Sequence, residues 1–299
     1  MDTNQSSVQV FLDYLKFQKR YSQHTIISYQ NDLKDFFEFI VMNYGNLALS
    51  EISTTLIRTW LANLKQDKIA AKSINRKISS LKSFFKYHLR KETISVSPMT
   101  TVVSLKVSKR LPSFIEEKDL ATLFQYVEFP DTWQGKTDRL LLQIFYQTGM
   151  RLSELINLKE SQIDKGYNNL KVLGKRNKER IIPINNLLLY SILEYINSKR
   201  DNVEIFDAEY LLINDKGKKL QPGYVYKTVK RYLGDVTTNE RKSPHILRHS
   251  FATHLTNNGA DINAVKELLG HSSLAATQIY THNSIEKLKD IHKKSHPKS

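Results

Sequence analysis

The stretch KSINRKISSLKSFFKYHLRK, residues 72–91, has the apolar period of a helix with one buried face. Its apolar residues recur three and four positions apart, which is the spacing of side chains on one side of an α-helix. We therefore predict an amphipathic helix packed against other helices. The inward side chains are expected to be Ile74, Ile78, Leu81, Phe85 and Leu89.

The other face of this helix carries only positive charge. No Asp or Glu occurs between Lys72 and Lys91, so no acid–base pair within the stretch neutralises its cations. We expect this face to contact the phosphates of a polyanion rather than solvent alone. The residues expected to bind there are Lys72, Arg76, Lys77, Lys82 and Lys86.

Three more helices are expected before residue 72. Phe11, Tyr14 and Leu15 share one stripe of the first helix. Ser22 and Ser53 are suitable N-caps for the second and third. Their inward faces are Ile26, Tyr29, Leu33, Phe36, Phe37 and Ile40 for the second and Leu56, Trp60, Leu61 and Leu64 for the third. Residues 1–97 therefore read as a four-helix domain.

The charge of the whole chain points to nucleic acid as its partner. Its 299 residues include 45 Lys+Arg against 30 Asp+Glu, a net charge of +15. Both halves of the chain carry an excess of positive charge, so both are expected to touch the polyanion.

The absence of cysteine excludes disulfides and thiol catalysis. Because no apolar run approaches ~18 residues, we expect a soluble, cytoplasmic protein with no membrane partner.

Beyond the first domain, residues 98–112 lose helical periodicity and form a basic linker candidate. Residues 113–299 are expected to form a second, mostly helical domain. Its one exception is a predicted β-hairpin, with strands at 170–173 and 180–184. The loop of this hairpin is cationic and contributes Lys175, Arg176 and Lys178.

Two segments of the second domain place arginines at helix starts. Arg151 follows the glycine turn at Gly149. His245 and Arg248 stand three apart in a helix that begins at Pro244, so both are expected to project from its first turn. The free N–H groups of a helix start favour an anion, and an arginine fork beside a titratable imidazole suits phosphoryl transfer.

A third segment, residues 268–282, contains His271 in a turn after Gly270 and Tyr280 on the following predicted helix. One tyrosine among 15 is ordinarily a packing residue, so its position alone indicates no chemistry. Tyr280 gains significance only if the other segments converge on it.

The order and spacing of these residues resemble the tyrosine recombinase (phage integrase-like) family, and most closely its Xer subfamily. The family pattern is an Arg, a hairpin Lys, His-x-x-Arg, a His in a Leu-Gly-His turn and a nucleophilic Tyr nine residues later. The matching positions here are Arg151, Lys175, His245, Arg248, His271 and Tyr280. The resemblance implies a mainly α, C-shaped, two-domain DNA clamp with a SAM-like core-binding domain and a catalytic domain.

The resemblance also implies the reaction, a transesterification that cuts and rejoins duplex DNA through a 3′-phosphotyrosyl link to Tyr280. His245 is then the expected base, and the arginines hold the phosphate. Lys175 is expected to protonate the leaving oxygen, and His271 to hydrogen-bond a phosphate oxygen. Neither metal nor cofactor is expected. The implied partners are a recombination site, a tetramer of this chain with itself or with a paralogous recombinase, and a DNA-translocase activator.

The implied role is resolution of chromosome dimers at cell division, and a mobile-element integrase of the same family would use identical residues. Two other classes also remain. His245 and His249 lie four apart on one helix face, a spacing that suits a metal-dependent DNA phosphodiesterase, although no acidic cluster accompanies them. A catalytically inactive DNA-binding relative would keep the clamp, but all six positions are filled here.

Overall fold

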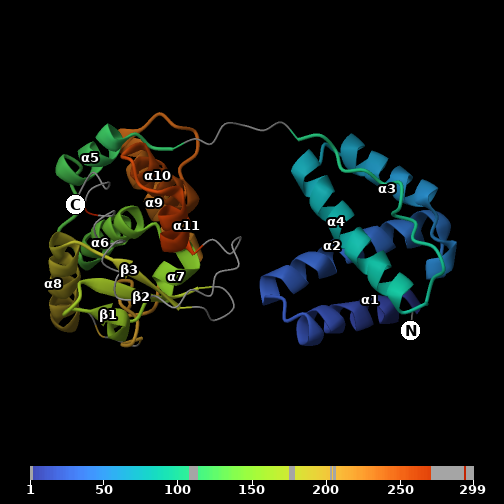
Figure 1. The fold of residues 1–299 in the computed structure, drawn as a ribbon, viewed down its shortest axis with the longest axis horizontal. Coiled ribbons are helices and arrows are strands. Elements are labelled where there is room, and N and C mark those ends of the chain that lie inside the picture. The colour runs from blue at the N-terminus through green and yellow to red at the C-terminus, as the bar shows by residue number, and fades with distance from the viewer. Residues whose placement is uncertain are drawn as a thin grey trace. The chain divides into compact units, whose positions relative to one another are not determined.

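The computed structural model describes residues 3–107, 114–174, 179–202, 204, 207–270 and 293. The chain divides into two compact units, Met1–Arg110 and Leu111–Ser299, and Figure 1 shows both as mainly helical. The described residues hold a single three-stranded sheet, in the second unit. The mainly α fold expected from the sequence is thereby confirmed.

The first unit is a helical bundle in which two helices begin at the predicted caps, Ser22 and Ser53. The Ser22 and Ser53 side chains accept hydrogen bonds from the backbone N–H groups of Thr25 and Leu56. Its elements are α1 (Thr3–Asp13), the π-helical turn η1 (Tyr14–Gln18), α2 (Gln23–Tyr44), the 3-10 turn η2 (Leu49–Glu51), α3 (Thr54–Gln66) and α4 (Ala71–Arg90).

An aromatic cluster forms the core of this unit, where α1, α2 and α4 meet. Phe84 packs edge-on against Phe11, Phe37 and Phe85. Leu33, Phe36 and Ile40 are fully buried on α2, as their period predicts. Leu89 was expected inside but is 39% exposed. It lies in the last turn of α4, where Tyr87 and His88 take the inward positions.

The basic face of α4 is smaller than the sequence indicates. Lys77 is only 7% exposed, and its ammonium group pairs with Asp32 at 3.3 Å and Asp35 at 2.5 Å on α2. The prediction that Lys77 faces phosphates is therefore wrong, because acids on a neighbouring helix neutralise it. Arg76 also pairs with Asp32, at 2.7 Å, but its side chain is half-exposed. Of the five predicted contacts, Lys72, Arg76, Lys82 and Lys86 are exposed.

The segment after α4 lies along the first unit. Met99 and Val102 are buried in the core of that unit. Asn75 on α4 both donates to the carbonyl of Leu105 and accepts from its N–H group. The first half of the predicted linker is therefore fixed to the first unit as far as residue 105.

The second unit is built around α6, which is buried along most of its length and contacts both α8 and α10. A helix that is apolar on nearly all sides belongs in the centre of a domain. The unit contains α5 (Glu117–Gln125), α6 (Trp133–Thr148), α7 (Leu152–Ile156), the 3-10 turn η3 (Glu160–Gln162), β1 (Ile163–Asp164), β2 (Asn169–Leu173), β3 (Glu179–Pro183), α8 (Asn186–Asn202), α9 (Pro222–Val236), α10 (Pro244–Asn257) and α11 (Ile262–Leu269).

The predicted hairpin is confirmed, since β2 and β3 pair antiparallel with Leu170 opposite Ile182 and Leu173 opposite Glu179. β1 pairs with the other edge of β2. This strand was not anticipated, because two residues are too few to show an alternating pattern. β3 also contacts α11, which brings the hairpin next to the end of that helix. No helix in the described ranges is long and apolar enough to cross a membrane.

Candidate active site

Arg151 lies where the sequence analysis expected it, after a glycine turn and at the start of a helix. Gly149 ends α6 in the left-handed conformation, with φ +58°. A Cβ atom there would lie 2.3 Å from the ring of Phe251, so the turn requires glycine for both its conformation and its packing. Arg151 is the N-cap residue of α7, and its side chain is 20% exposed.

α10 presents His245 and Arg248 in different environments. Pro244 is the first helical residue, as predicted, although the Ser243 side chain makes no capping hydrogen bond. His245 is exposed, whereas Arg248 is only 8% exposed. Leu247, Phe251 and Leu255 form a buried apolar stripe on the same helix. Arg248 is therefore fixed within the site, while His245 lies at its surface.

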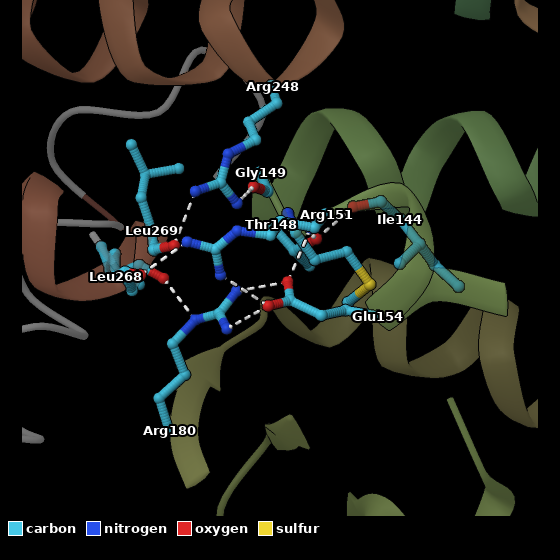
Figure 2. A network of polar contacts seen from close by, with 11 residues as sticks. Ile144, Thr148, Gly149, Arg151, Glu154, Arg180, Arg248, Leu268 and Leu269 are labelled. Carbon is cyan, nitrogen blue, oxygen red and sulfur yellow. Dashed lines mark hydrogen bonds and ion pairs between the residues drawn. The ribbon is translucent and has the colours of Figure 1, made fainter. Parts of the chain in front are cut away.

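Three arginines from three elements converge on the end of α11 (Figure 2). Each donates to one of the three consecutive backbone carbonyls there, where the helix dipole favours positive charge. The bonds run from Arg180 Nε to Leu268 O at 2.8 Å, from Arg248 Nη2 to Leu269 O at 2.6 Å and from Arg151 Nη2 to Gly270 O at 2.6 Å. Arg248 Nη1 also donates to the carbonyl of Gly149, at 2.6 Å.

The carboxylate of Glu154 lies among these arginines and is 6% exposed. Arg180 binds it through two parallel hydrogen bonds, each of 2.8 Å. Arg151 binds it through its backbone N–H at 2.6 Å and through Nη1 at 2.7 Å. Glu154 thus joins the start of α7 to strand β3.

The electrostatics of the cluster follow from this arrangement. Burial by itself would raise the pKa of Glu154, but hydrogen bonds and charge from Arg180 and Arg151 outweigh it and lower that pKa to about 2. Burial, followed by the positive charge of Arg151, lowers the pKa of Arg248 to about 10. Glu154 and Arg248 are therefore both charged at neutral pH. The excess of positive charge suits an anion such as a phosphodiester.

Glu154 and Arg180 were given no role from the sequence, although each carries a signal. Glu154 stands three residues after Arg151 at a helix start, the position from which a carboxylate reaches back to the N-cap backbone. Arg180 alternates with Ile182 and Ile184, so it shares the inward face of β3 with apolar residues. A buried cation at such a position requires an acidic partner.

The remaining predicted site residues lie outside the described ranges. They are Lys175, Arg176, Lys178, His271 and Tyr280. His245 and His249 both lie on α10. Within the described part of the chain, no three His, Asp or Glu side chains are arranged to hold a metal ion.

The fold and the site define a two-unit, mainly helical protein with a buried cluster of three arginines in its second unit. Two family models match the chain: "Phage integrase, N-terminal SAM-like domain" over residues 8–92 and "Phage integrase family" over residues 113–287. Proteins named Tyrosine recombinase XerC are similar over nearly the full chain. The protein from Listeria welshimeri is 38% identical, covering 97% of both chains. That from Chlorobaculum parvum is 34% identical, covering 97% of this chain and 94% of its own.

Solved structures share the fold at lower identity. XerH recombinase bound to a palindromic difH substrate has a TM-score of 0.72 at 23% identity, with 97% of this chain and 90% of that chain covered. The Tn1549 transposon integrase bound to transposon right-end DNA has a TM-score of 0.75 at 17% identity, covering 95% of this chain and 98% of that one.

The chain belongs to the phage integrase family, the tyrosine recombinases. The resemblance drawn from the six motif positions is therefore confirmed. The protein is an enzyme, a site-specific DNA recombinase.

Proposed function

We propose that this recombinase cuts and rejoins DNA through a 3′-phosphotyrosyl intermediate on Tyr280 and resolves chromosome dimers at cell division. The observation that carries the proposal is the convergence of Arg151 and Arg248. They come from separate helices, yet both donate to carbonyls at the end of α11. The chain that continues from there carries His271 and then Tyr280.

The proposed reaction exchanges one phosphodiester bond for another. The Tyr280 oxygen attacks phosphorus while the bond to the 5′-oxygen breaks, so the bond energy is kept for rejoining. A free tyrosine has a pKa near ~10, so the proton must pass to a base, which we assign to His245. Lys175 protonates the leaving 5′-oxygen, and His271 donates to a phosphate oxygen.

The two arginines have a separate task in this proposal. Negative charge accumulates on the non-bridging oxygens as phosphorus becomes five-coordinate, and Arg151 and Arg248 neutralise it. Glu154 and the α11 carbonyls hold these side chains in place before substrate arrives. No metal is needed in this mechanism.

The partners we propose are suggested by the solved structures of similar recombinases. XerH is seen bound to its difH substrate and lambda integrase as a tetramer on a Holliday junction. We assign to this protein a tetramer on two sites, with itself or with a paralogous recombinase, and a DNA-translocase activator in the cytoplasm. Residues 1–97 are the proposed core-binding domain, and 113–299 the catalytic domain, joined by residues 98–112. The proposed phosphate contacts are Lys72, Arg76, Lys82, Lys86, Arg176 and Lys178.

Covalent trapping tests the reaction directly. The protein is incubated in EDTA with a nicked duplex that carries the chromosome-terminus site of its own organism. We expect a protease-sensitive protein–DNA adduct that Tyr280→Phe abolishes without weakening DNA binding. An adduct formed by Tyr280→Phe would assign the nucleophile to another residue. Dependence on a divalent metal would favour the phosphodiesterase.

A choice of DNA substrate separates the chromosomal role from the mobile-element role. The chromosomal role predicts faster trapping on the terminus site than on a duplex of unrelated sequence and equal length. Equal trapping on both would contradict the chromosomal role but leave the recombinase chemistry intact. If no adduct forms, the candidate paralogue is added, and continued absence would support an inactive DNA-binding protein.

Removing either catalytic arginine should slow cleavage strongly while leaving site binding largely intact. We expect Arg151→Ala or Arg248→Ala to remove roughly 3 kcal/mol of transition-state stabilisation, by analogy with losing one oxyanion-hole donor. Single-turnover cleavage of the nicked duplex measures this loss. A fall of less than tenfold would show that the residue does not hold the reacting phosphate.

A further inference from the structure

We propose that Arg180 is a positioning residue for both catalytic arginines: it fixes the Glu154 carboxylate and the end of α11, to which Arg151 and Arg248 are hydrogen-bonded. This inference rests on the proposed function. It assigns a role to Arg180, which is not one of the six positions that match the family pattern.

The contacts of Arg180 are with the protein itself and point to an indirect role in the reaction. Its Nη1 and Nη2 groups each donate to one oxygen of Glu154, and its Nε group donates to Leu268 O. Every nitrogen of the guanidinium is therefore engaged with the protein. The residue is 6% exposed. With three of its five N–H groups bound to the protein and its side chain buried, Arg180 acts on the reaction through the groups it holds.

The first of those groups is the carboxylate that orients Arg151. Glu154 Oε1 accepts from both Arg180 Nη1 and Arg151 Nη1. Oε2 accepts from both Arg180 Nη2 and the Arg151 backbone N–H. Because the planar fork of Arg180 takes both oxygens, it fixes the plane of the carboxylate. The direction in which Arg151 presents its guanidinium is fixed in turn.

The second group is the backbone at the end of α11. Arg180 holds the carbonyl of Leu268, and the next two carbonyls receive Arg248 and Arg151. Gly270 reaches its left-handed conformation at φ +63° beside Arg180, and a Cβ atom there would lie 3.2 Å from Arg180 Cδ and Nη1. Arg180 therefore packs against the turn from which the chain leads to His271.

Lysine cannot replace Arg180 in this role. An ammonium group would preserve the charge beside Glu154, but it is a single point charge without a planar fork. It would hold one carboxylate oxygen, so only Arg151, the residue that Glu154 orients, would still bind both oxygens. The proposal therefore predicts that geometry, and not charge alone, is required at residue 180.

The test is a double-mutant cycle on single-turnover cleavage of the nicked site. We expect Arg180→Met and Arg180→Lys to lower the rate by about 10- to 100-fold, with site affinity changed by less than about threefold. In an Arg151→Ala background, Arg180→Met should cost several-fold less than in the unmodified protein, because one of the two side chains it positions is absent. An independent structural effect would give the same fold-loss in both backgrounds and overturn the proposal.

Lys199→Met is the matched control. Lys199 is another buried cation of the second unit, 1% exposed, and pairs with Glu160 at 2.8 Å. Its hydrogen bonds within the described chain involve Glu160, Ala208 and Tyr210, none of which contacts the arginine cluster. Losing this ion pair should lower the thermal midpoint but leave the cleavage rate per folded molecule unchanged.

The outcomes separate this proposal from the proposed function. Rates are expressed per DNA-binding-competent molecule, so loss of folded protein does not count as loss of positioning. If Arg180→Met does not fold, the cycle is run with Arg180→Lys, which keeps the charge beside Glu154. Full activity of Arg180→Lys would overturn the positioning role. Failure of the unmodified protein to form an adduct on Tyr280 would instead overturn the proposed function.

Discussion

A buried glutamate at the centre of an arginine cluster has a clear physical purpose. Arg151, Arg180 and Arg248 all approach the same helix end, and their mutual repulsion would disperse them without a counter-charge. Glu154 supplies one negative charge, and the α11 carbonyls supply partial negative charge. Because one carboxylate does not neutralise three guanidinium groups, an attraction for phosphate remains.

The ionisation of Glu154 predicts how stability changes in acid. The pKa of its carboxyl falls from 4.5 to about 2 on folding. A lowered folded-state pKa stabilises the fold fully above the unfolded value and loses this contribution as pH falls from about 4.5 to 2. The contribution is on the order of 3 kcal/mol. Urea unfolding between pH 6 and 3 should therefore show a smaller acid loss for Glu154→Gln than for the unmodified protein, and equal losses would contradict this assignment.

The turn at Gly149 leads to a second prediction, on both stability and cleavage rate. Gly149→Ala combines a strained φ of +58° with a Cβ atom 2.3 Å from Phe251 Cδ1, so the turn before Arg151 must shift. We expect a loss of at least about 1 kcal/mol of stability and slower cleavage, since Gly149 O also holds Arg248. Gly234→Ala is the control, because its Cβ would meet nothing within 4 Å inside α9. Equal effects of the two changes would rule out a special role for the turn.

At the scale of elements, α4 shows how one helix separates structure from binding. Its inward side includes Lys77, which together with Asp32 and Asp35 ties α4 to α2. Asp32 is fully buried and also accepts from Ser80 at 2.8 Å. The outward side carries the cations with no acid on the same helix to pair with. The buried network positions the helix, and the exposed cations are the ones we propose to contact phosphate.

Breaking this buried network should destabilise the first unit. Asp32→Ala removes the hydrogen-bond partner of Ser80 and leaves Lys77 with Asp35 alone. We expect a loss of about 3 kcal/mol in the free energy of unfolding, measured with urea. Glu38→Ala is the control, because Glu38 pairs with Lys34 where both side chains are more than half exposed, and should cost under about 0.5 kcal/mol. A loss for Asp32→Ala as small as that of Glu38→Ala would contradict the structural role.

At the scale of the whole molecule, the net charge of +15 predicts salt-sensitive DNA binding. Changing Lys72, Lys82 or Lys86 to Ala should each reduce the slope of log affinity against log salt by about 1, because each removes a cation that meets phosphate. Lys77 lies on the same helix but is buried, so Lys77→Met should leave the slope of log affinity against log salt unchanged. Titrations at several salt concentrations compare these variants. A slope for Lys77→Met that falls as far as that of Lys82→Ala would refute this division of α4.

The sequence alone determined the class of fold, the hairpin, the helix starts and the six motif positions. These features are local, because periodicity, caps and glycine turns depend on residues a few positions apart. Arg151 and Arg248 could be identified in this way. The family resemblance supplied the chemistry, which local pattern does not contain.

Only the tertiary structure decided which charges pair. Lys77 has no acid on its own helix, and the two that neutralise it lie more than forty residues earlier, on α2. Glu154 and Arg180 are 26 residues apart, and the α11 carbonyls that complete their cluster lie farther still along the chain. The energy of a charge depends on burial and on neighbours in space, and the packing of α7, β3, α10 and α11 brings those neighbours together.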